Sequence, residues 1–477
     1  MRERGRWKIR GSAIAAVSAA AVGLAAYAAP AGANVRTAPS GGVSPAAALG
    51  TPQLKKTGKV LEVVRQLVQC GGTMYAVGTF TEISQGKKVY QRKNIFSFSA
   101  TAPYTVTSWA PNVHGEINSI AFNGSNCGDA YIGGQFTDID GAHAKNIAEI
   151  STSTGNVVPG FKANASATVY TVLAAGGHLL VGGFFSYISG THDSYLASLD
   201  PATGKDDGFV HLKISGTYHF CAKGGKPCTP RDNRSQVYNQ QLSHSGKLDL
   251  VEGRFTSVNG QARQQIFMLN LAGRKATVTG WTSPEFDGSN PSAYPYYECW
   301  PTTAFYVRTA AWSPDDKTVY LATTGFRPAQ NPTITGPRTG LCDSVAAFPA
   351  TQSSVTHTWI EYSGCDSYYS VSADSTTVYA AGDPRWADNS DGCNKAGPGA
   401  VPDMGLQGLN AANGNVELNS SGTAMYTMTR ANADTMLMTS GGLWIGSTNR
   451  YTVNKCGDLK GPPGHNAAGH AGICLLP

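Results

Sequence analysis

The sequence is poor in charge: Asp, Glu, Lys and Arg together make up 14% of its 477 residues. It contains no G-x-S-x-G elbow, H-E-x-x-H pair, Walker loop or dinucleotide-binding G-x-G-x-x-G pattern. No C-x-x-C pair occurs among the ten cysteines, which argues against a zinc ribbon or a thioredoxin-like redox site. From these absences we expect no cofactor and no metal, and no catalytic residue can be assigned from a local motif.

Long apolar runs are also missing, with one exception at the start of the chain. The run of residues 13–29 follows five basic residues, Arg2, Arg4, Arg6, Lys8 and Arg10, and precedes Ala31-Gly32-Ala33. This order is typical of a secretory signal peptide, which we predict for residues 1–33. The alternative is a retained membrane anchor, but the run is shorter than the ~20 residues that a spanning helix needs. We therefore expect a secreted, extracellular mature protein without a membrane span.

The formal net charge of +6 gives little indication of a basic partner surface. Without the five basic residues and one acidic residue of the signal peptide, the net charge falls to +2. We therefore expect no nucleic-acid partner. The high glycine content, 56 residues, favours a β-rich and turn-rich protein, and cysteines in an exported chain are expected to form disulfides.

One phrase, an apolar strand followed by Gly-x-Phe-Thr/Ser, recurs along the chain. It reads IGGQFTDIDG at 132–141, VGGFFSYISG at 181–190, VEGRFTSVNG at 251–260 and AVGTFTEISQ at 76–85. Aligning the glycine that closes each strand gives seven units: Gly78, Gly134, Gly183, Gly253, Gly325, Gly382 and Gly446. A phrase repeated this often indicates a scaffold, in which glycine permits close approach between neighbouring units.

Each unit also carries the pattern of four short strands. An apolar strand leads into a hairpin turn such as SPDDK or SADSTT, the Gly-terminated strand follows, and a third and a fourth strand complete the unit. The fourth usually ends in an aromatic residue: Trp109, Phe161, Phe209, Trp281 or Trp359. The pattern predicts an all-β fold, a seven-bladed β-propeller of four-stranded antiparallel blades. The last unit lacks a fourth strand, so we expect the N-terminal segment near 47–56 to supply it and close the ring.

The repeated phrase, followed by Asp/Asn-x-x-Thr-Gly (LDPATG at 199–204), resembles the delta-60 repeat β-propellers of secreted bacterial proteins. The resemblance covers about residues 60–290, whereas WSPDDKTVYLAT at 312–323 is similar to the more general propeller repeat. It implies a propeller but no activity. We divide the chain into the signal peptide 1–33, a flexible segment 34–46 and a single propeller domain 47–477.

Long insertions interrupt the last four units, at 213–236, 285–303, 326–343, 383–403 and 447–471. Propeller geometry places these connections on one face. Cys70 and Cys127 occupy equivalent turns of adjacent units, so we expect them to pair on the other face. For the remaining cysteines the same geometric reasoning suggests the pairs Cys221–Cys228, Cys299–Cys365, Cys342–Cys393 and Cys456–Cys474, although sequence alone does not fix connectivity.

The insertions and their borders are rich in Tyr, Trp and Arg, the residue types favoured at contact hot spots. The alternative interpretation is that these side chains only pack the loops onto the ring. The candidate ligand-binding residues are Tyr294, Tyr296, Tyr297, Trp300, Arg327, Tyr362, Tyr368, Tyr369, Arg385, Trp386, Arg450 and Tyr451.

Two oxygen-rich stretches suggest calcium at first sight. At the positions equivalent to Asp138 and Asp140 the other units have Glu82 and Ser84, Tyr187 and Ser189, or Ser257 and Asn259, so we interpret the stretch Asp138–Gly141 as a turn. Around Asp388, Asn389 and Asp391, Ala387 occupies the position of the first ligand of an EF-hand loop, which disfavours metal.

We expect a monomer that binds an extracellular glycan or protein through the insert-bearing face. The alternatives are a hydrolase or lyase with its site at the axis, and a scaffold subunit of an exported assembly. Carboxylates and histidines converging at the axis would favour the enzyme.

Overall fold

The computed structural model describes residues 42–55, 57, 61–217, 234–286, 306–325, 340–428, 433–447 and 472–477. The fold of these residues is all-β: every strand pair is antiparallel, and the only helical element among them is the single 3-10 turn η1 (Pro284–Phe286). The predicted signal peptide 1–33 lies outside the described residues. No helix among the residues described is long and apolar enough to cross a membrane.

Seven of the ten sheets in the described residues follow one another along the chain. The first three sheets are β2 (Val63–Cys70), β3 (Thr73–Thr79) and β6 (Ile95–Ser99); β7 (Val113–Ala121), β8 (Asp129–Ile139) and β10 (Ile147–Ser151); and β11 (Val169–Ala175), β12 (His178–Gly183) and β13 (Leu196–Leu199). The fourth and fifth sheets have four strands each: β15 (Gln236–Leu242), β16 (Leu248–Arg254), β19 (Ile266–Asn270) and β20 (Thr277–Val278); and β21 (Tyr306–Trp312), β22 (Thr318–Thr324), β23 (Ser344–Pro349) and β24 (Trp359–Tyr362). The sixth and seventh sheets are β25 (Tyr368–Ala373), β26 (Thr377–Gly382) and β29 (Leu406–Asn410); and β30 (Ala433–Thr439), β31 (Gly442–Ser447) and β32 (Ile473–Leu476).

The remaining strands are short and form hairpins at the periphery. They are β1 (Gln53–Leu54), β4 (Glu82–Gln85), β5 (Lys88–Gln91), β9 (Ala142–His143), β14 (Ile214–Ser215), β17 (Ser257–Val258), β18 (Gln261–Ala262), β27 (Trp386–Ala387) and β28 (Val401–Pro402).

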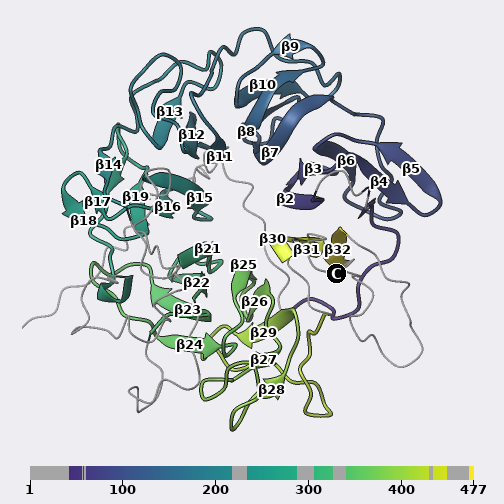
Figure 1. Ribbon diagram of the computed structural model, residues 1–477, viewed down its shortest axis with the longest axis vertical. Coiled ribbons are helices and arrows are strands. Elements are labelled where there is room, and N and C mark those ends of the chain that lie inside the picture. Colours follow the sequence, from purple (N-terminus) through teal and green to yellow (C-terminus); the bar gives the residue numbers. More distant parts are fainter. Residues whose placement is uncertain are drawn as a thin grey trace, which may run out of the picture.

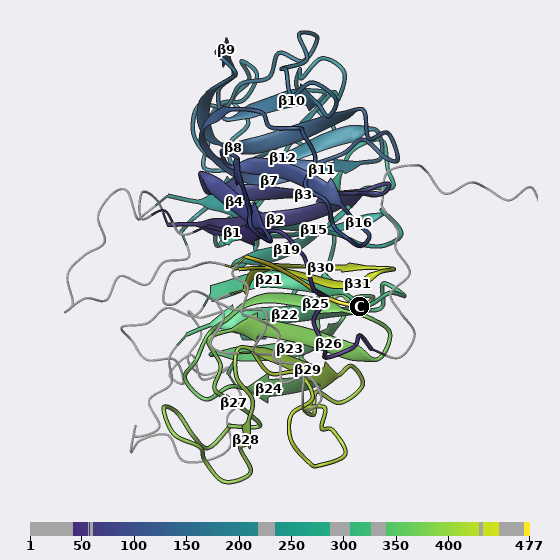
Figure 2. The same cartoon turned by 90° about the vertical axis from the view of Figure 1, so that its right-hand side faces the viewer.

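The seven sheets are arranged around a central axis, as in a β-propeller (Figure 1). The first strand of each sheet lies innermost, and these strands contact one another in the order β2, β7, β11, β15, β21, β25 and β30, with β30 in contact with β2 again. Figure 2 shows the sheets from the side. Buried hydrophobic clusters fill the space between neighbouring sheets, for example Val77, Ile117 and Ile132 between the first and the second.

The two ends of the described chain meet at the last sheet. The backbone amides of Ser44 and Ala48 donate to the carbonyls of Pro477 (2.6 Å) and Leu475 (2.8 Å). Gln53 forms an antiparallel bridge with Gly472. The segment 44–53 therefore runs along β32, the outermost strand of its sheet.

The glycines of the repeated phrase occupy two sterically different positions. A Cβ on Gly78, Gly134, Gly183, Gly253 or Gly382 would lie 1.9–2.4 Å from a carbonyl oxygen of the chain at the start of the same sheet. A Cβ on the preceding position, Gly133 or Gly182, would instead lie 2.4–2.7 Å from a valine of the next sheet. The expected close approach between units is thus correct for the first glycine of each Gly-Gly pair. The second glycine instead permits close approach to the backbone at the start of its own sheet.

The strand registers show that two of the seven glycines aligned from sequence, Gly325 and Gly446, do not hold the expected position. Val307 pairs with Thr323 and Ala433 with Ser447, so Thr323 and Ser447 hold the position assigned from sequence to Gly325 and Gly446. The Thr323 hydroxyl donates to the carbonyl of Ser344 (3.1 Å), and the Ser447 hydroxyl accepts from the amide of Gly472 (3.1 Å). At this position of the second strand, these two sheets have a side-chain hydroxyl that hydrogen-bonds to the third strand or to the residue before it. The other five sheets have glycine there.

The rest of the phrase builds a peripheral hairpin. Phe80, Phe136, Phe185 and Phe255 are each at most 1% exposed. The turns that follow place two consecutive residues at positive φ, namely Asp140-Gly141 (49° and 81°), Ser189-Gly190 (50° and 87°) and Asn259-Gly260 (51° and 76°). Two such residues make a tight hairpin connection, which is why the phrase ends in Asp, Ser or Asn followed by Gly. The expectation of a turn at Asp138–Gly141 is confirmed.

The aromatic residues of the fourth strands close the seams between sheets. The indole nitrogens of Trp109, Trp281 and Trp359 donate to the carbonyls of Ser151 (3.0 Å), Pro349 (2.9 Å) and Ala411 (3.0 Å), each at the end of the third strand of the next sheet. The fourth strand itself is short: only β20 and β24 extend beyond a single bridge in the described residues.

The disulfides agree with the sequence in part. Cys70–Cys127 joins the first two sheets as expected. Cys365 pairs with Cys393, so the expected pairs Cys299–Cys365 and Cys342–Cys393 are wrong. Cys342 and Cys474 are also disulfide-bonded, whereas Cys221, Cys228, Cys299 and Cys456 lie outside the described residues.

Candidate functional site

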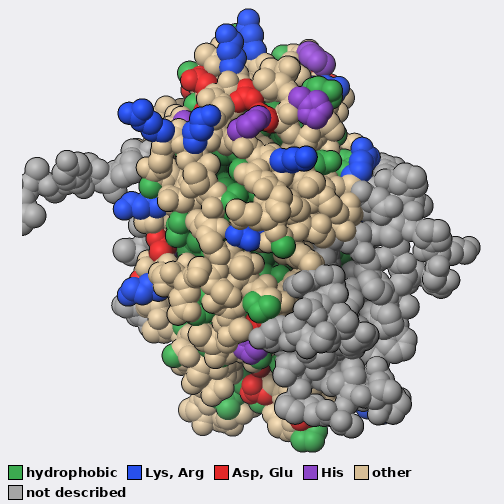
Figure 3. Space-filling view, turned by 90° about the vertical axis from the view of Figure 1, so that its left-hand side faces the viewer, with side chains coloured by type: hydrophobic (Ala, Val, Ile, Leu, Met, Phe, Trp, Pro, Cys, Tyr) green, Lys and Arg blue, Asp and Glu red, His purple; other side chains and the backbone are tan. Residues whose placement is uncertain are grey.

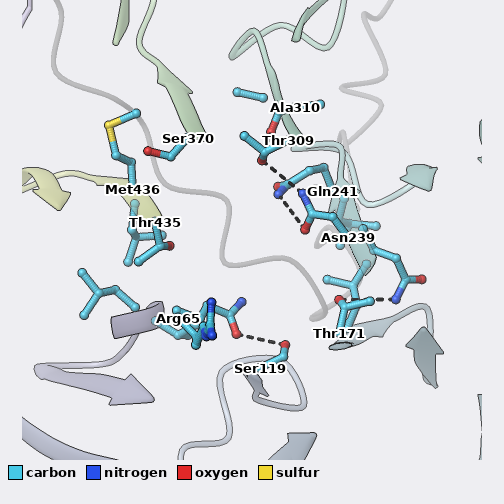
Figure 4. A pocket seen from close by; sticks show the side chains of 18 of the residues that line it. Arg65, Ser119, Thr171, Asn239, Gln241, Thr309, Ala310, Ser370, Thr435 and Met436 are labelled. Carbon is cyan, nitrogen blue, oxygen red and sulfur yellow. Dashed lines mark hydrogen bonds between the residues drawn. The ribbon is translucent and has the colours of Figure 1, made fainter. Parts of the chain in front are cut away.

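A cavity of about 710 Å³ lies at the axis, and the first strands of all seven sheets line it. In Figure 4 the labelled side chains, among them Arg65, Ser119, Thr171, Asn239, Thr309, Ser370 and Thr435, surround this central space. Because strand β30 lies beside β2, residues from the first and the last sheets share the same cavity wall. The cavity is thus the point where side chains from every sheet come closest together.

Each first strand carries a β-bulge at the same place. The pairing with the second strand skips one residue in all seven sheets, immediately after Val64, Ile117, Val169, Val237, Val307, Tyr368 and Ala433. The skipped residues, which we call the bulge ring, are Arg65, Asn118, Tyr170, Tyr238, Arg308, Tyr369 and Asp434, and all seven line the cavity. A bulge redirects a side chain and often lies near a functional site.

The residues on either side of the bulge do not vary in character, whereas the bulge ring does. The preceding position is fully buried in every sheet. The following position is always polar and uncharged: Gln66, Ser119, Thr171, Asn239, Thr309, Ser370 and Thr435. The fold therefore constrains both neighbours, and the bulge is the position where Arg, Asn, Tyr and Asp replace one another. Two bulge-ring side chains also bond the next sheet: Asn118 Nδ2 donates to the carbonyl of Val169 (2.9 Å), and the Tyr238 hydroxyl donates to the carbonyl of Val307.

The polar layer next to the bulges joins neighbouring sheets. The Ser119 hydroxyl donates to Gln66 Oε1 (2.9 Å) and accepts from the amide of Val172 (3.1 Å), while the Ser370 hydroxyl donates to the carbonyl of Ala433 (2.8 Å). Asn239 Nδ2 donates to Thr309 Oγ1 (3.1 Å). Four pairs of neighbouring sheets are thus joined at their inner edges, so that part of the exposed edge is satisfied within the protein.

Positive charge gathers beside the tyrosines of the bulge ring. The Arg308 guanidinium lies 5.7 Å from the centre of the Tyr369 ring, and Arg254, at the end of β16, lies 5.3 Å from that of Tyr306. Burial raises the pKa of the Tyr170 hydroxyl, and Arg254 and Arg65 oppose this shift. Burial likewise raises the pKa of Tyr238, opposed by Arg308 and Arg254. Glu116 and Asp434 are the carboxylates among the described residues of this end of the cavity.

The opposite end of the cavity is more apolar, although Gln69, Ser243 and His244 also line it. Its lining comes from the ends of the first strands and includes Phe122, Leu242, Trp312, Leu437 and Met438. The described strands that border the five insertions meet the insertions at the bulge end: β15 and β21 begin there after 213–236 and 285–303, and the other three insertions follow second strands whose last residues pair beside the bulges. The charged mouth therefore lies on the side where these strands begin or end.

Seven of the twelve candidate ligand-binding residues lie outside the described residues: Tyr294, Tyr296, Tyr297, Trp300, Arg327, Arg450 and Tyr451. Among the other five, Tyr369 belongs to the bulge ring and lines the cavity. Tyr362 and Tyr368 are 5% and 0% exposed, and their hydroxyls donate to the Gly340 carbonyl (3.0 Å) and to Gln407 Oε1 (2.5 Å). Tyr362 and Tyr368 are therefore core residues, which agrees with the interpretation that these aromatic side chains pack the loops onto the ring.

Arg385 and Trp386 belong to the insertion 383–403, which is described in full. Arg385 forms a bidentate ion pair with Asp366, with its Nε and Nη2 atoms 2.7 and 2.8 Å from the carboxylate oxygens. Asn389 is fully buried and accepts the amide of Gly397 (2.8 Å), and Cys365–Cys393 fixes the loop covalently. Trp386 is half-buried on β27. This insertion is held in place before any ligand arrives.

Carboxylates elsewhere do not assemble a metal site in the described part of the chain, where no group of three or more His, Cys, Asp or Glu side chains is placed to hold an ion. Asn389, one of the calcium candidates, is instead used to hold its loop. Asp138 lies against His114 and Thr137 at the surface.

On the side drawn in Figure 3, the Lys and Arg side chains of the described part lie mostly over the upper half of the view, together with Asp, Glu and His. The axial mouth combines several arginines with tyrosines around a single opening.

Comparison with known proteins does not assign the chain to a family. No family model and no curated protein matches it. Among solved structures, the β-propeller domain of Cps50 (Swd1) from Myceliophteria thermophila is similar at 10% identity and a TM-score of 0.40, covering 67% of this chain and 80% of that one.

The bulge ring was missed by the sequence reasoning, which searched the insertions for recognition residues. A signal exists: an apolar or tyrosine residue, a variable residue and an uncharged polar residue stand in this order in every first strand, at its start in six sheets and in the middle of β7 in the second, as in Val64-Arg65-Gln66 and Val307-Arg308-Thr309. The pattern is short and was hidden because the alignment was anchored on the glycines of the second strands.

Proposed function

We propose that this protein is a secreted, non-catalytic binding propeller that recognises an extracellular ligand, a glycan or a protein, at the bulge-ring end of its axis. The observation that carries the proposal is the bulge ring itself. Seven sheets repeat one backbone device at one opening, yet the side chains placed there differ from sheet to sheet. Invariant backbone with variable side chains is what a recognition surface on a repeated scaffold requires.

The proposal includes a closed ring of seven four-stranded blades, in which the segment 44–53 supplies the outer strand of the last blade. Its support is the hydrogen bonding of this segment along β32 and the contact between β30 and β2. Val43 adds to this attachment: its amide donates to the Tyr379 hydroxyl (2.9 Å), and its carbonyl accepts from that of Tyr426 (2.8 Å). Closure removes the free edge that the first and last sheets would otherwise expose.

Secretion is supported by the signal-peptide pattern of residues 1–33 and by the disulfides Cys70–Cys127 and Cys365–Cys393, which persist in oxidising compartments. The delta-60 repeat resemblance points in the same direction.

Binding is favoured over hydrolysis by the make-up of the mouth. Its tyrosines and arginines are the residue types that supply contact energy at low entropic cost. The carboxylates there, Glu116 and Asp434, come from the second and the last sheet, and the histidine that lines the cavity, His244, lies at the opposite end, in the turn after β15. A general acid–base pair would need such groups within reach of one substrate.

The proposal is tested by probing the full-length mature protein against a glycan array and a panel of extracellular proteins. Each binding partner is then measured again with Tyr170→Ala, Tyr369→Ala and Trp386→Ala, and with Lys275→Ala as control. Lys275 is exposed in the turn between the third and fourth strands, at the other end of the sheets. We expect Tyr170→Ala and Tyr369→Ala to weaken binding while Lys275→Ala does not. Equal binding by all variants would refute the site.

A further inference from the structure

We infer that the mouth of the axial cavity selects an anionic ligand, and specifically the carboxylates of an acidic glycan. This deepens the proposed function and rests on it. The inference starts from three arginines, Arg65, Arg254 and Arg308, which come from three different sheets and line the same cavity.

The three guanidinium groups have no carboxylate partner in the described part of the chain. The ion pairs found there involve Arg385, lysines and histidines, but none of these three arginines. Arg65 and Arg308 are also exposed. Arginines with a structural role usually donate hydrogen bonds to a carboxylate or a backbone carbonyl, as Arg385 and Arg263 do here. Unpaired arginines at an opening keep their planar donors available for a ligand.

The three arginines line one cavity and share two tyrosine neighbours. Arg254 acts electrostatically on both Tyr170 and Tyr238, which belong to neighbouring sheets, whereas Arg65 acts on Tyr170 and Arg308 on Tyr238. Each tyrosine thus lies within the field of two of the three arginines, and Arg254 is common to both. Tyr369 and Tyr306 lie beside Arg308 and Arg254, at the distances given above, and so limit the orientations of two of the guanidinium groups.

Carboxylates also face this group. Glu116, which accepts a hydrogen bond from the Thr79 hydroxyl (3.2 Å), and Asp434 line the same end of the cavity, so three arginines face two carboxylates there. Glu252 also acts on Tyr238, but burial raises the pKa of the Glu252 carboxyl well above its usual value and so favours its neutral form. Arg65 and Arg254 are separated by the sheets that carry Asn118 and Tyr170, whereas Arg254 and Arg308 come from consecutive sheets. The excess of positive charge therefore falls on the side formed by β11, β15 and β21.

Acidic glycans match this arrangement better than neutral ones. A carboxylate takes the two parallel hydrogen bonds that a guanidinium offers, and the pyranose ring that carries it packs against tyrosine. A protein ligand with an acidic side chain is a separate possibility that the experiment distinguishes.

The test uses isothermal titration of the mature protein with oligogalacturonate and with a neutral malto-oligosaccharide of the same length, at two salt concentrations. We expect the acidic oligomer to bind and the neutral one not to. Arg65→Gln and Arg308→Gln should each weaken binding about tenfold and the double variant about a hundredfold. The control is Arg274→Gln, which removes the same charge from an exposed turn at the opposite end. Circular dichroism verifies that each variant is folded.

The outcomes separate this inference from the proposed function. If Arg274→Gln weakens binding as much as Arg65→Gln, the attraction is non-specific and the inference fails. If oligogalacturonate does not bind but a neutral glycan or a protein binds in a Tyr369-dependent manner, the anion preference fails while the recognition site stands. If no array partner depends on any bulge-ring residue, both fail.

Discussion

The backbone amide of Ala48 donates a hydrogen bond of 2.8 Å to the carbonyl of Leu475, so that the start of the described chain lies along the outermost strand of the last sheet. Thr51 reinforces the attachment by donating its hydroxyl to the carbonyl of Ile473 (2.7 Å). Val43 and Leu54, which flank this segment, are 4% and 6% exposed. The start of the described chain is therefore part of the core and should contribute measurably to stability.

A chain beginning at Thr57 should be less stable than one beginning at Gly42. Losing the burial of Val43 and Leu54 removes about 3–6 kcal/mol, at about 1.5–3 kcal/mol for each side chain. Urea unfolding followed by tryptophan fluorescence measures the difference. Identical midpoints for the two chains would show that the segment does not close the ring.

Gly253→Ala should destabilise the fourth sheet by about 2–4 kcal/mol, because the added Cβ would lie 2.1 Å from the Gln236 carbonyl oxygen. Gly72→Ala is the matched control, since a Cβ there meets nothing within 4 Å. Urea unfolding of both variants checks the prediction. A Gly253→Ala protein as stable as Gly72→Ala would mean that the hairpin relaxes without cost.

Replacing both Cys70 and Cys127 by Ser should cost about 4 kcal/mol, since the bond closes a loop with a sequence separation of 57. The corresponding pair Cys365 and Cys393, with a separation of 28, should cost slightly less, about 3.6 kcal/mol. Denaturant unfolding measures both losses, and non-reducing peptide mapping tests the pairs directly. A peptide linking Cys365 to any other cysteine would contradict the structure.

The stability of the protein should depend on pH through Glu149. Burial is the main cause that raises the pKa of this carboxyl from 4.5 to about 7, while a hydrogen bond from Tyr131 opposes the shift and Asp129 adds to it. The folded state then binds more protons than the unfolded state between these values, so stability falls as the pH rises from about 4.5 to 7.

Glu149→Gln removes this dependence. Relative to the wild type, the variant should gain about 2 kcal/mol of unfolding free energy between pH 5 and pH 8, because only the wild type must bury a charge at the higher pH. Asp200→Asn is the control. Asp200 and Glu149 line one small cavity away from the axis, and hydrogen bonds from Thr203 lower the pKa of Asp200. A gain that is equal at both pH values would assign the effect to packing.

The repeats predicted much of the scaffold because their signals are local. Phe136, Asp140-Gly141 and Trp109 each act through the geometry of one hairpin or one seam, and the same residues recur wherever that geometry recurs. Cys70–Cys127 was predictable for the same reason, since equivalent turns of adjacent sheets lie side by side.

Prediction failed where the chain departs from the repeat. Cys365 and Cys393 are joined because the insertion 383–403 folds back over the end of β24, and no repeated position records that path. Thr323 and Ser447 could not be predicted from a glycine pattern, because their sheets have a hydrogen-bonding hydroxyl at the position where the other five sheets have glycine. Tyr368 was grouped with Tyr369 by composition, although the bulge sends one into the core and the other to the cavity.

The bulges also bear on how such a protein can change over evolution. Of three adjacent positions, the first fills the core and the third bonds a neighbouring sheet, while the bulge position between them faces the opening. At Asn118 and Tyr238 the bulge side chain also bonds the next sheet, whereas Arg65 and Arg308 form no such bond among the described residues. If the opening is the recognition site that we propose, substitutions at Arg65 or Arg308 would change its specificity while leaving the hydrophobic clusters between the sheets intact.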